Sequence, residues 1–246
     1  MRQLVAGNWK MNGLGPVLGG FAAHKDALAH AACDVLVCPP ATLLARAALT
    51  VAGVVALGGQ DCSPEDSGAF TGDISAAMLK DAGATSVILG HSERRRIHGE
   101  TDSLVAAKAE AAWRAGLSTI ICIGETAVQR DAGQAHAVSY RQIAGSVPDA
   151  ATAANTAIAY EPVWAIGSGM TATSSEIAAM HAHIRSCLVE TLGPAGQDVR
   201  ILYGGSVRPA NAAEILRLPE VGGALVGGAS LDIQEFLSII AAVKTL

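Results

Sequence analysis

Eight short apolar segments recur at nearly even spacing along this 246-residue chain. They begin at Leu4, Asp34, Val54, Ser86, Ser118, Thr156, Arg200 and Gly223, so successive starts lie about 31 residues apart on average. That interval accommodates a strand, a crossover helix and the return to the next parallel strand. The segments are continuously apolar rather than alternating, which is typical of strands covered on both faces.

Stretches rich in Ala, Leu, Glu, Lys and Arg separate these segments, and those at 102–114 and 174–192 predict helices. Eight alternating units in a chain of this length predict an α/β protein with a closed (β/α)8 barrel, in which helices surround eight parallel strands. An open doubly wound sheet is the competing architecture, but it usually has fewer strands at this length. No Pro-, Gly- or Ser-rich linker interrupts the pattern, so we expect a single domain over 1–246.

The charge pattern argues against nucleic acid and membrane partners. The formal net charge is −5, and the 17 Lys and Arg residues are scattered, with Arg94-Arg95-Arg96 as the longest basic run. Nucleic-acid binding is therefore disfavoured. The N-terminal MRQLVAGNWK lacks the apolar core of a signal peptide, and no apolar stretch has the length of a membrane span. Five cysteines without a CxxC pair are typical of reduced thiols, so we expect a cytoplasmic protein.

Unusual polar residues stand just after several of the predicted strands. Asn8 and Lys10 end the first strand, His91 and Glu93 follow the fourth, and Glu161 follows the sixth. In a parallel barrel the catalytic side chains gather at the C-terminal ends of the strands. Any one of these residues, taken alone, could be a solvated side chain or one that satisfies backbone groups. Their meeting at one mouth of the barrel predicts an active site.

These residue types suit an anionic substrate on which charge develops during the reaction. Asn8 and Lys10 are two residues apart on a strand, so their side chains share a face and Trp9 points the opposite way. The ammonium group would neutralise a phosphodianion or an oxyanion. His91 precedes Ser92, a candidate helix N-cap, and the positive end of that helix opposes protonation of the ring. We therefore expect a neutral His91 that donates a hydrogen bond.

The segment after Glu161 has the composition of a lid. Pro162 biases its predecessor toward extended backbone, which would hold the carboxylate at the strand end. The stretch that follows is apolar and ends in glycines: Val163, Trp164, Ala165, Ile166, Gly167, Ser168 and Gly169. Such a loop is typical of a lid that closes over a site. A solvated loop glutamate is the alternative interpretation of Glu161.

Two glycine pairs follow the last two strands, Gly204-Gly205 and Gly227-Gly228. They lack the lysine of a P-loop and the spacing of a dinucleotide fingerprint. Glycine pairs also simply end strands, but this position favours a phosphate held by backbone N–H groups. No second His or Cys stands at ligand spacing from His91, and His181 and His183 would diverge on a helix. We expect neither a metal nor a cofactor.

Five motifs occur in the order of a known enzyme family. From position 4 to about position 231, AGNWKMN, GHSERR, AYEPVWAIG, YGGSV and LVGGASL resemble the triosephosphate isomerase family. The resemblance implies a TIM barrel that interconverts dihydroxyacetone phosphate and D-glyceraldehyde 3-phosphate in glycolysis and gluconeogenesis. It also implies an enediolate intermediate and proton shuttling without cofactor or metal.

The resemblance implies a role for each polar residue. Glu161 looks like the general base, and His91 looks like the neutral group that polarises the carbonyl. Lys10 and Asn8 resemble the electrostatic partners of the enediolate oxygens. Glu93 matches a family carboxylate near the lysine, for which a purely structural ion pair with Lys10 is the alternative.

The resemblance further implies a phosphate cradle, an apolar clamp and a subunit contact. Backbone N–H groups would hold the phosphate at Gly167, Ser206, Gly227 and Gly228. The side chains of Ile166 and Leu225 would clamp the closed site. Segment 67–75 resembles the loop that family members insert into a partner subunit, so Thr71 would reach residues 8–10 of a second copy in a homodimer. An ordinary surface turn is the alternative.

Three positions depart from the family pattern, and none of them removes a catalytic group. Met170 stands at the far end of the lid, where a lysine is common, and would alter lid opening rather than chemistry. Gly222 stands where an aspartate is frequent, which leaves the partner of Arg185 open. Asp73 replaces the more usual glutamate of the intersubunit loop.

Two other functions stay open on the sequence alone. One is a barrel isomerase of a four-carbon sugar phosphate, although the bulky Ile166 and Leu225 favour a three-carbon substrate. The other is a catalytically silent relative that only binds a phosphorylated ligand or a partner protein. Loss of Glu161, His91 or Lys10 would have indicated such a relative, and all three are present.

Overall fold

Eight parallel strands close into a barrel in a computed structural model that describes residues 2–51, 53–167 and 170–243. The strands are β1 (Leu4–Asn8), β2 (Asp34–Cys38), β3 (Ala56–Gly59), β4 (Ser86–Leu89), β5 (Ser118–Ile123), β6 (Thr156–Tyr160), β7 (Arg200–Tyr203) and β8 (Gly223–Val226). Each strand pairs in parallel with its sequence neighbours, and β8 pairs with β1. The predicted (β/α)8 barrel is confirmed, and an open sheet is ruled out.

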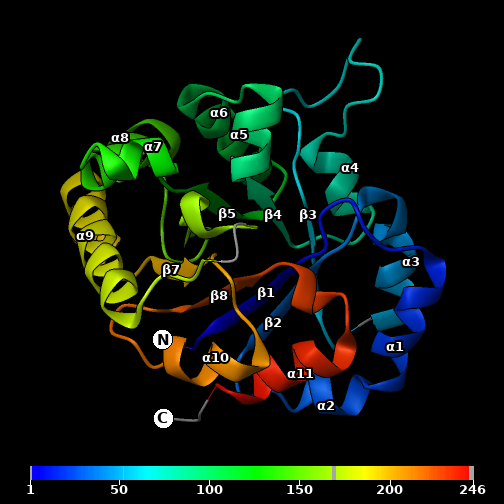
Figure 1. The fold of residues 1–246 in the computed structure, drawn as a ribbon. Helices are drawn as coiled ribbons and strands as arrows, with labels where there is room; N and C mark the ends of the chain where they lie inside the picture. Colours follow the sequence, from blue (N-terminus) through cyan, green and yellow to red (C-terminus); the bar gives the residue numbers. More distant parts are fainter. Residues whose placement is uncertain (1, 52, 168–169, 244–246) are drawn as a thin grey trace.

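Helices surround the barrel on its outside (Figure 1). They are α1 (Leu18–Ala23), α2 (Lys25–Ala29), α3 (Ala41–Val51), α4 (Ala76–Asp81), α5 (Ser92–His98), α6 (Asp102–Arg114), α7 (Ala127–Asp131), α8 (Ala135–Ser146), α9 (Ser174–Leu192), α10 (Pro209–Ile215) and α11 (Ile233–Ala241). Short 3-10 helices are η1 (Gly15–Val17), η2 (Val163–Ala165), η3 (Gly193–Gln197) and η4 (Gly228–Ser230). The helices expected at 102–114 and 174–192 are α6 and α9.

The third strand begins later than the apolar pattern predicts. The pattern starts at Val54, but Val54 lies in the turn that follows α3, and β3 begins at Ala56. Gly53, with a φ of 72°, makes this turn, and the Val54 N–H donates to the Val51 carbonyl. The apolar side chain of Val54 instead packs against the core from the turn.

Two layers of apolar side chains make the core. Small and branched residues fill the barrel interior: Ala6, Leu36, Cys38, Ile88, Ile120, Cys122, Ala157, Ala159, Leu202 and Leu225. A larger cluster lies between the strands and the helices. On β5 the two layers alternate, with Ile120 and Cys122 inside and Ile121 and Ile123 facing the helices. The strands are therefore covered on both faces, as their continuous apolar sequence predicts.

Arg185 on α9 finds an acidic partner other than the family aspartate. Its Nε donates to Oε2 of Glu220 at 2.8 Å, and its Nη1 donates to the Gly196 carbonyl at 2.5 Å. Glu220 has a left-handed backbone, with a φ of 61°. The partner of Arg185, which the sequence left open, is therefore the Glu220 carboxylate, two residues before Gly222.

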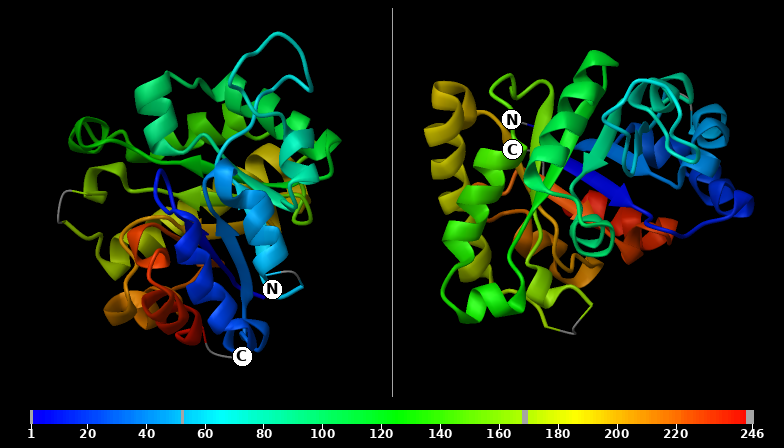
Figure 2. Two further views of the ribbon diagram at one scale, coloured as in Figure 1. Left: turned by 90° about the vertical axis from the view of Figure 1, so that its right-hand side faces the viewer. Right: turned by 90° about the horizontal axis from the view of Figure 1, so that it is seen from above.

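Segment 67–75 runs between β3 and α4 and projects from the body of the molecule, as two views show (Figures 1 and 2). Its residues from Ser67 to Asp73 are exposed.

Among the described residues, no helix is both long and apolar enough to cross a membrane.

His181 is a buried ionisable group outside the barrel mouth. The ring is fully buried on α9, edge-on to Tyr160 at 6.1 Å between centroids and 6.3 Å from Tyr203. Its Nδ1 lies 3.2 Å from the Glu220 carbonyl, and Nε2 has no hydrogen-bond partner among the described residues. Burial lowers the pKa of His181 to about 4. His183, by contrast, stacks on His136, so the two histidines of this helix face different neighbours.

We expect the free energy of unfolding to fall as pH decreases from about 6.5 to about 4. In that window the unfolded chain takes up a proton on His181 that the folded chain refuses, which destabilises the fold by up to about 3 kcal/mol. Urea unfolding of the wild type and His181→Gln across this range measures the effect. His98→Gln, at an exposed position, is the control. An equally steep pH dependence in His181→Gln would show that other groups cause it.

Candidate active site

A cavity of about 420 Å³ opens at the mouth formed by the C-terminal ends of the strands. Ten residues expected at the site line it: Asn8, Lys10, His91, Glu161, Ile166, Gly167, Ser206, Leu225, Gly227 and Gly228. They come from β1, β4, β6, β7 and β8 and the loops that follow these strands. The lining also contains Gly204, Gly205, Val207, Arg208, Ala229 and Glu235. Of these, sequence reasoning had not singled out the last four.

The Glu161 carboxylate is buried, with 1% of the residue exposed. Its Oε2 accepts a hydrogen bond from the Ser92 N–H at 2.9 Å, and its Oε1 accepts one from the Ser92 hydroxyl at 3.0 Å. His91 Nε2 also lies 3.0 Å from Oε1. Both carboxylate oxygens are thus engaged by the first turn of α5 and the residue before it. A solvated loop glutamate, the alternative from sequence, does not fit this burial.

His91, rather than Ser92, caps α5. The His91 Nδ1 accepts a hydrogen bond from the Glu93 N–H at 3.2 Å, which is the N-cap contact of this helix. Because Nδ1 accepts, the nitrogen that can donate toward Glu161 is Nε2. The expectation that Ser92 caps the helix is therefore wrong. Its hydroxyl faces Glu161 because the imidazole already occupies the cap position.

The surroundings of Glu161 set the pKa of its carboxyl. Burial alone raises this pKa, because the charged form loses its hydration. The hydrogen bonds that the carboxylate accepts from His91 and Ser92 act in the opposite direction and outweigh it. The net effect lowers the pKa of Glu161, so the group is a carboxylate at neutral pH. The Cys122 thiol lies beside it, and burial together with this negative charge raises the thiol pKa well above its ordinary value.

Lys10 reaches the cavity from a turn rather than from a strand. β1 ends at Asn8, whose Oδ1 accepts a hydrogen bond from the Lys10 N–H at 2.9 Å. Lys10 has a φ of 54°, a conformation uncommon outside glycine, and Gln60 Nε2 donates to its carbonyl at 2.8 Å. The extended register predicted for Asn8 and Lys10 is therefore wrong, although both side chains line the cavity. Trp9 turns away and is buried in the core, as expected.

Glu93 forms an ion pair with Lys10. The Lys10 Nζ lies 2.7 Å from Oε1 of Glu93, and both side chains are partly exposed. Glu93 does not line the 420 Å³ cavity but a neighbouring groove of about 1020 Å³. The structural ion pair that the sequence left open is therefore present.

The segment after Glu161 covers one side of the cavity. Pro162 precedes η2 (Val163–Ala165), and Ile166 and Gly167 line the cavity. Ala165 is buried, whereas Trp164 is partly buried. Gly167 has a φ of 71°, which favours glycine. Ser168 and Gly169, also expected in the lid, lie outside the described residues. Met170 is half exposed.

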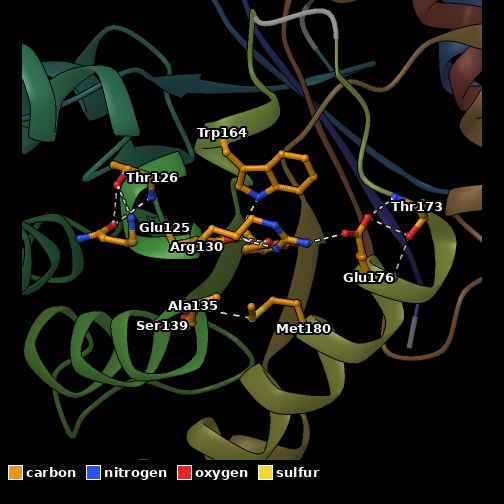
Figure 3. A network of polar contacts seen from close by, with 11 residues as sticks. Glu125, Thr126, Arg130, Ala135, Ser139, Trp164, Thr173, Glu176 and Met180 are labelled. Atoms are coloured by element: carbon orange, nitrogen blue, oxygen red, sulfur yellow. Dashed lines mark hydrogen bonds and ion pairs between the residues drawn. The ribbon is translucent and has the colours of Figure 1, made fainter. Parts of the chain in front are cut away.

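One polar network holds both ends of this segment (Figure 3). Trp164 Nε1 donates to Glu125 Oε1 at 2.9 Å, and the guanidinium of Arg130 lies 4.2 Å from the centre of the Trp164 ring. Arg130 also pairs with Glu125 at 3.3 Å and with Glu176. Glu176 forms a capping box with Thr173 at the start of α9. Sequence reasoning missed this network, although the spacing TSSE at 173–176 is a capping-box signal.

Thr71 does not line the 420 Å³ cavity of its own chain. Its loop neighbours Asp73 and Ile74 line the adjacent groove, as do Lys10 and Glu93. Among the described residues, no group of three or more His, Cys, Asp and Glu side chains could hold a metal ion.

The chain is similar to known triosephosphate isomerases over nearly its whole length. The family model described as triosephosphate isomerase matches residues 3–243. The triosephosphate isomerase of Afipia carboxidovorans is 60% identical over 242 residues, covering 97% of this chain and 96% of the relative. That of Rhodopseudomonas palustris is 58% identical, covering 98% and 97%. The crystal structure of the Bartonella henselae triosephosphate isomerase superposes with a TM-score of 0.92 at 49% identity, covering 98% and 99%.

We expect Ser92→Ala to raise the pKa of the Glu161 carboxyl. The substitution removes the hydroxyl bond to Oε1 and keeps the backbone N–H bond to Oε2. Losing a hydrogen bond to the charged form stabilises that form less, so the carboxyl takes up its proton at a higher pH. Infrared titration of the folded protein measures it, with the exposed Ser103→Ala as control. An unchanged carboxyl titration in Ser92→Ala would contradict the hydroxyl contact.

Proposed function

This chain belongs to the triosephosphate isomerase family, and from that premise we propose how its residues carry the reaction. The enzyme interconverts dihydroxyacetone phosphate and D-glyceraldehyde 3-phosphate, a step of glycolysis. We assign proton transfer to Glu161, carbonyl polarisation to His91, and stabilisation of the enediolate oxygens to Lys10 and Asn8. The observation that carries these assignments is that all four residues line the same cavity as the glycines after β7 and β8.

The reaction requires a base and oxyanion donors together. Removing a proton from the carbon beside a carbonyl leaves an enediolate, whose negative charge must be stabilised as it forms. A positioned base typically contributes about 10²–10⁴ in rate, and one oxyanion donor about 3–4 kcal/mol. Because neither effect alone removes a large barrier, the two kinds of group must act on one substrate at once.

Glu161 becomes the base by leaving Ser92. In the free enzyme its two oxygens are engaged by Ser92 and His91, which keeps the carboxyl ionised. A base must come within hydrogen-bond reach of the proton it removes, so the carboxylate has to turn toward the substrate. It then loses the bonds that lower its pKa while it remains buried, and burial raises that pKa. The carboxylate therefore becomes a stronger base at the moment when it faces the substrate carbon.

His91 and Lys10 stabilise the opposite side of the reacting group. The neutral His91 ring has its proton on Nε2, the nitrogen on the Glu161 side, so it can donate to a substrate oxygen once the carboxylate turns. The ammonium of Lys10 supplies a positive charge at the same mouth, and Asn8 fixes the turn that presents it. Glu93 holds the ammonium through their ion pair until substrate arrives. The charge that develops on the enediolate thus meets a donor and a cation already in place.

The phosphate cradle and the lid retain the intermediate. We assign phosphate binding to backbone N–H groups of Gly167, Ser206, Gly227 and Gly228. The lid consists of Pro162, Val163, Trp164, Ala165 and Ile166, and Ile166 and Leu225 provide its apolar contact with substrate. An exposed enediolate would expel its phosphate, so excluding water and restraining the leaving group protects the product.

We propose that the whole chain, 1–246, acts as one cytoplasmic domain within a homodimer. Large exposed apolar side chains line the groove: Met11 at 97%, Ile74 at 36% and Ile97 at 63%. Exposed apolar surface of this kind marks an interaction site. The projecting loop that carries Thr71 fits the groove beside Lys10 and Glu93 of a second copy, where it would brace the Lys10 turn.

We expect Glu161→Gln to bind substrate but to lose turnover by at least about 10²–10⁴-fold, because the amide cannot accept the substrate proton. The measurement is a coupled assay that converts dihydroxyacetone phosphate with NADH, starting from glyceraldehyde 3-phosphate. Glu190→Gln, at an exposed position on α9, is the matched control. A four-carbon aldose phosphate, with its aldose and ketose forms followed directly by NMR, tests substrate length. Near-wild-type turnover in Glu161→Gln would remove this residue as the base.

We expect Thr71→Arg to weaken the dimer and to make the specific activity fall on dilution. The larger, charged side chain would clash in the groove of the second copy beside the Lys10–Glu93 pair. Sedimentation velocity and activity across a dilution series measure both effects, with Ala153→Arg in an exposed loop as control. A fully active monomer would refute the role of the loop.

A further inference from the structure

The three arginines of the basic run have different environments. Arg94 pairs with Asp61 at 2.8 Å and with Glu100 at 2.6 Å, and Arg96 is exposed. The side chain of Arg95 folds back toward the barrel and is only 15% exposed. The run is therefore no basic patch, and its central guanidinium lies inside the protein.

Arg95 donates hydrogen bonds to four structural elements. Its Nε donates to the Gly90 carbonyl at 2.8 Å, at the end of β4, and its Nη2 donates to the Cys122 carbonyl of β5 at 3.2 Å. Nη2 also donates to the Ser146 hydroxyl at 2.9 Å, at the end of α8. Nη1 donates to Asp102 Oδ1 at 2.6 Å, at the start of α6. One planar group thereby ties α5 to two neighbouring strands and to the two helices that cover them.

The junction between β4 and α5 is shaped to fit this guanidinium. Gly90 has a φ of 62°, and a Cβ there would lie 2.8 Å from Val105 and 3.0 Å from Arg95 Nη2. Asp102 Oδ1 also accepts the Ser146 hydroxyl at 3.0 Å, which fixes the carboxylate that faces Arg95. The charge of Arg95 is therefore balanced, and its position is determined from several sides.

The element that Arg95 fixes carries three hydrogen-bond donors to Glu161. His91 Nε2, the Ser92 N–H and the Ser92 hydroxyl all belong to the cap and first turn of α5. α5 has only seven residues, and a helix this short has little stability of its own. The same guanidinium holds the backbone of Cys122, whose thiol lies beside Glu161. A shift of Arg95 would therefore move the surroundings of the carboxylate on two sides.

We propose that Arg95 is a positioning residue that fixes the first turn of α5, and through it the ring of His91 and the resting place of Glu161. The inference rests on the roles proposed above for His91 and Glu161. Arginine suits the position because its fork donates in several fixed directions, whereas a lysine ammonium on a flexible stem does not reproduce that geometry.

The test compares Arg95→Met and Arg95→Lys with Arg200→Met. Arg200 is a matched control because it also has a partly buried guanidinium in an ion pair, with Asp34 at 2.7 Å, but lies at the start of β7, the end of the barrel opposite the cavity. Thermal unfolding, kcat, KM and the pH dependence of kcat/KM are measured for each variant. Misplacing a catalytic group by about 1 Å costs on the order of 10²-fold.

We expect Arg95→Met to lower kcat by roughly 10- to 100-fold with little change in KM, because substrate binding depends mainly on the phosphate cradle. The acid limb of kcat/KM moves to higher pH, since Glu161 loses well-placed donors. Arg95→Lys regains stability but not the wild-type pH profile. Arg200→Met loses stability while kcat and the acid limb stay at wild-type values.

An Arg95→Met variant whose kcat and acid limb match those of Arg200→Met would overturn the proposal and leave Arg95 a stabilising residue only. If Arg95→Met does not fold, Arg95→Lys and Asp102→Asn decide by the same criteria. Glu161→Gln and His91→Asn in the same assay separate the proposed roles of Glu161 and His91 from the proposed role of Arg95. Full turnover in Glu161→Gln and His91→Asn would contradict the proposed function. If these two variants are inactive while the Arg95 variants keep the wild-type kcat and acid limb, only the role of Arg95 is contradicted.

Discussion

The buried carboxylate of Glu161 can stay charged only because the start of α5 supplies it with donors. A buried charge without partners is strongly unfavourable, and here the Ser92 N–H, the Ser92 hydroxyl and the His91 ring provide three contacts. Glu161 follows β6, whereas its donors follow β4, and β5 lies between these strands. Only parallel strands that end at one mouth bring the two segments together. The parallel order of β4, β5 and β6 is therefore the condition for the charge, and in the proposed mechanism the charge is the condition for the chemistry.

The same strand end also anchors the segment that follows Glu161. Tyr160, the last residue of β6, donates its hydroxyl to Glu125 at 3.1 Å, and Trp164 donates to the same oxygen at 2.9 Å. The proposed base and the proposed lid are thus consecutive in the chain and share one support, which Arg130 extends to the start of α9. Neighbouring side chains therefore fix the position of Glu161 and of the segment after it together. In the proposed mechanism, water exclusion and proton transfer therefore depend on one small region of the barrel mouth.

The sequence predicts the positions of most strands and of two helices, because the spacing of apolar segments and the residues at strand ends are local features of the chain. Seven of the eight segments begin where strands begin, and α6 and α9 have their expected bounds. Four of the five polar residues at the strand ends meet in one cavity for the same reason, and Glu93 lines the neighbouring groove. Contacts between residues far apart in the sequence cannot be predicted in this way. The cap at His91, the positive φ of Lys10 and the guanidinium of Arg95 depend on partners that only the folded chain brings near. The Glu220 partner of Arg185 likewise arises from a backbone turn.

The central claim is that Glu161 rests on Ser92 in the free enzyme and leaves it to act on the substrate. A crystal structure with bound 2-phosphoglycolate, whose carboxylate stands in for the enediolate oxygens, tests this most directly. We expect the analogue to fill the cavity, with the Glu161 carboxylate turned away from Ser92 and within about 3 Å of the bound molecule. If the analogue occupies the cavity while Glu161 keeps both of its bonds to Ser92, this carboxylate does not serve as the base in the way described.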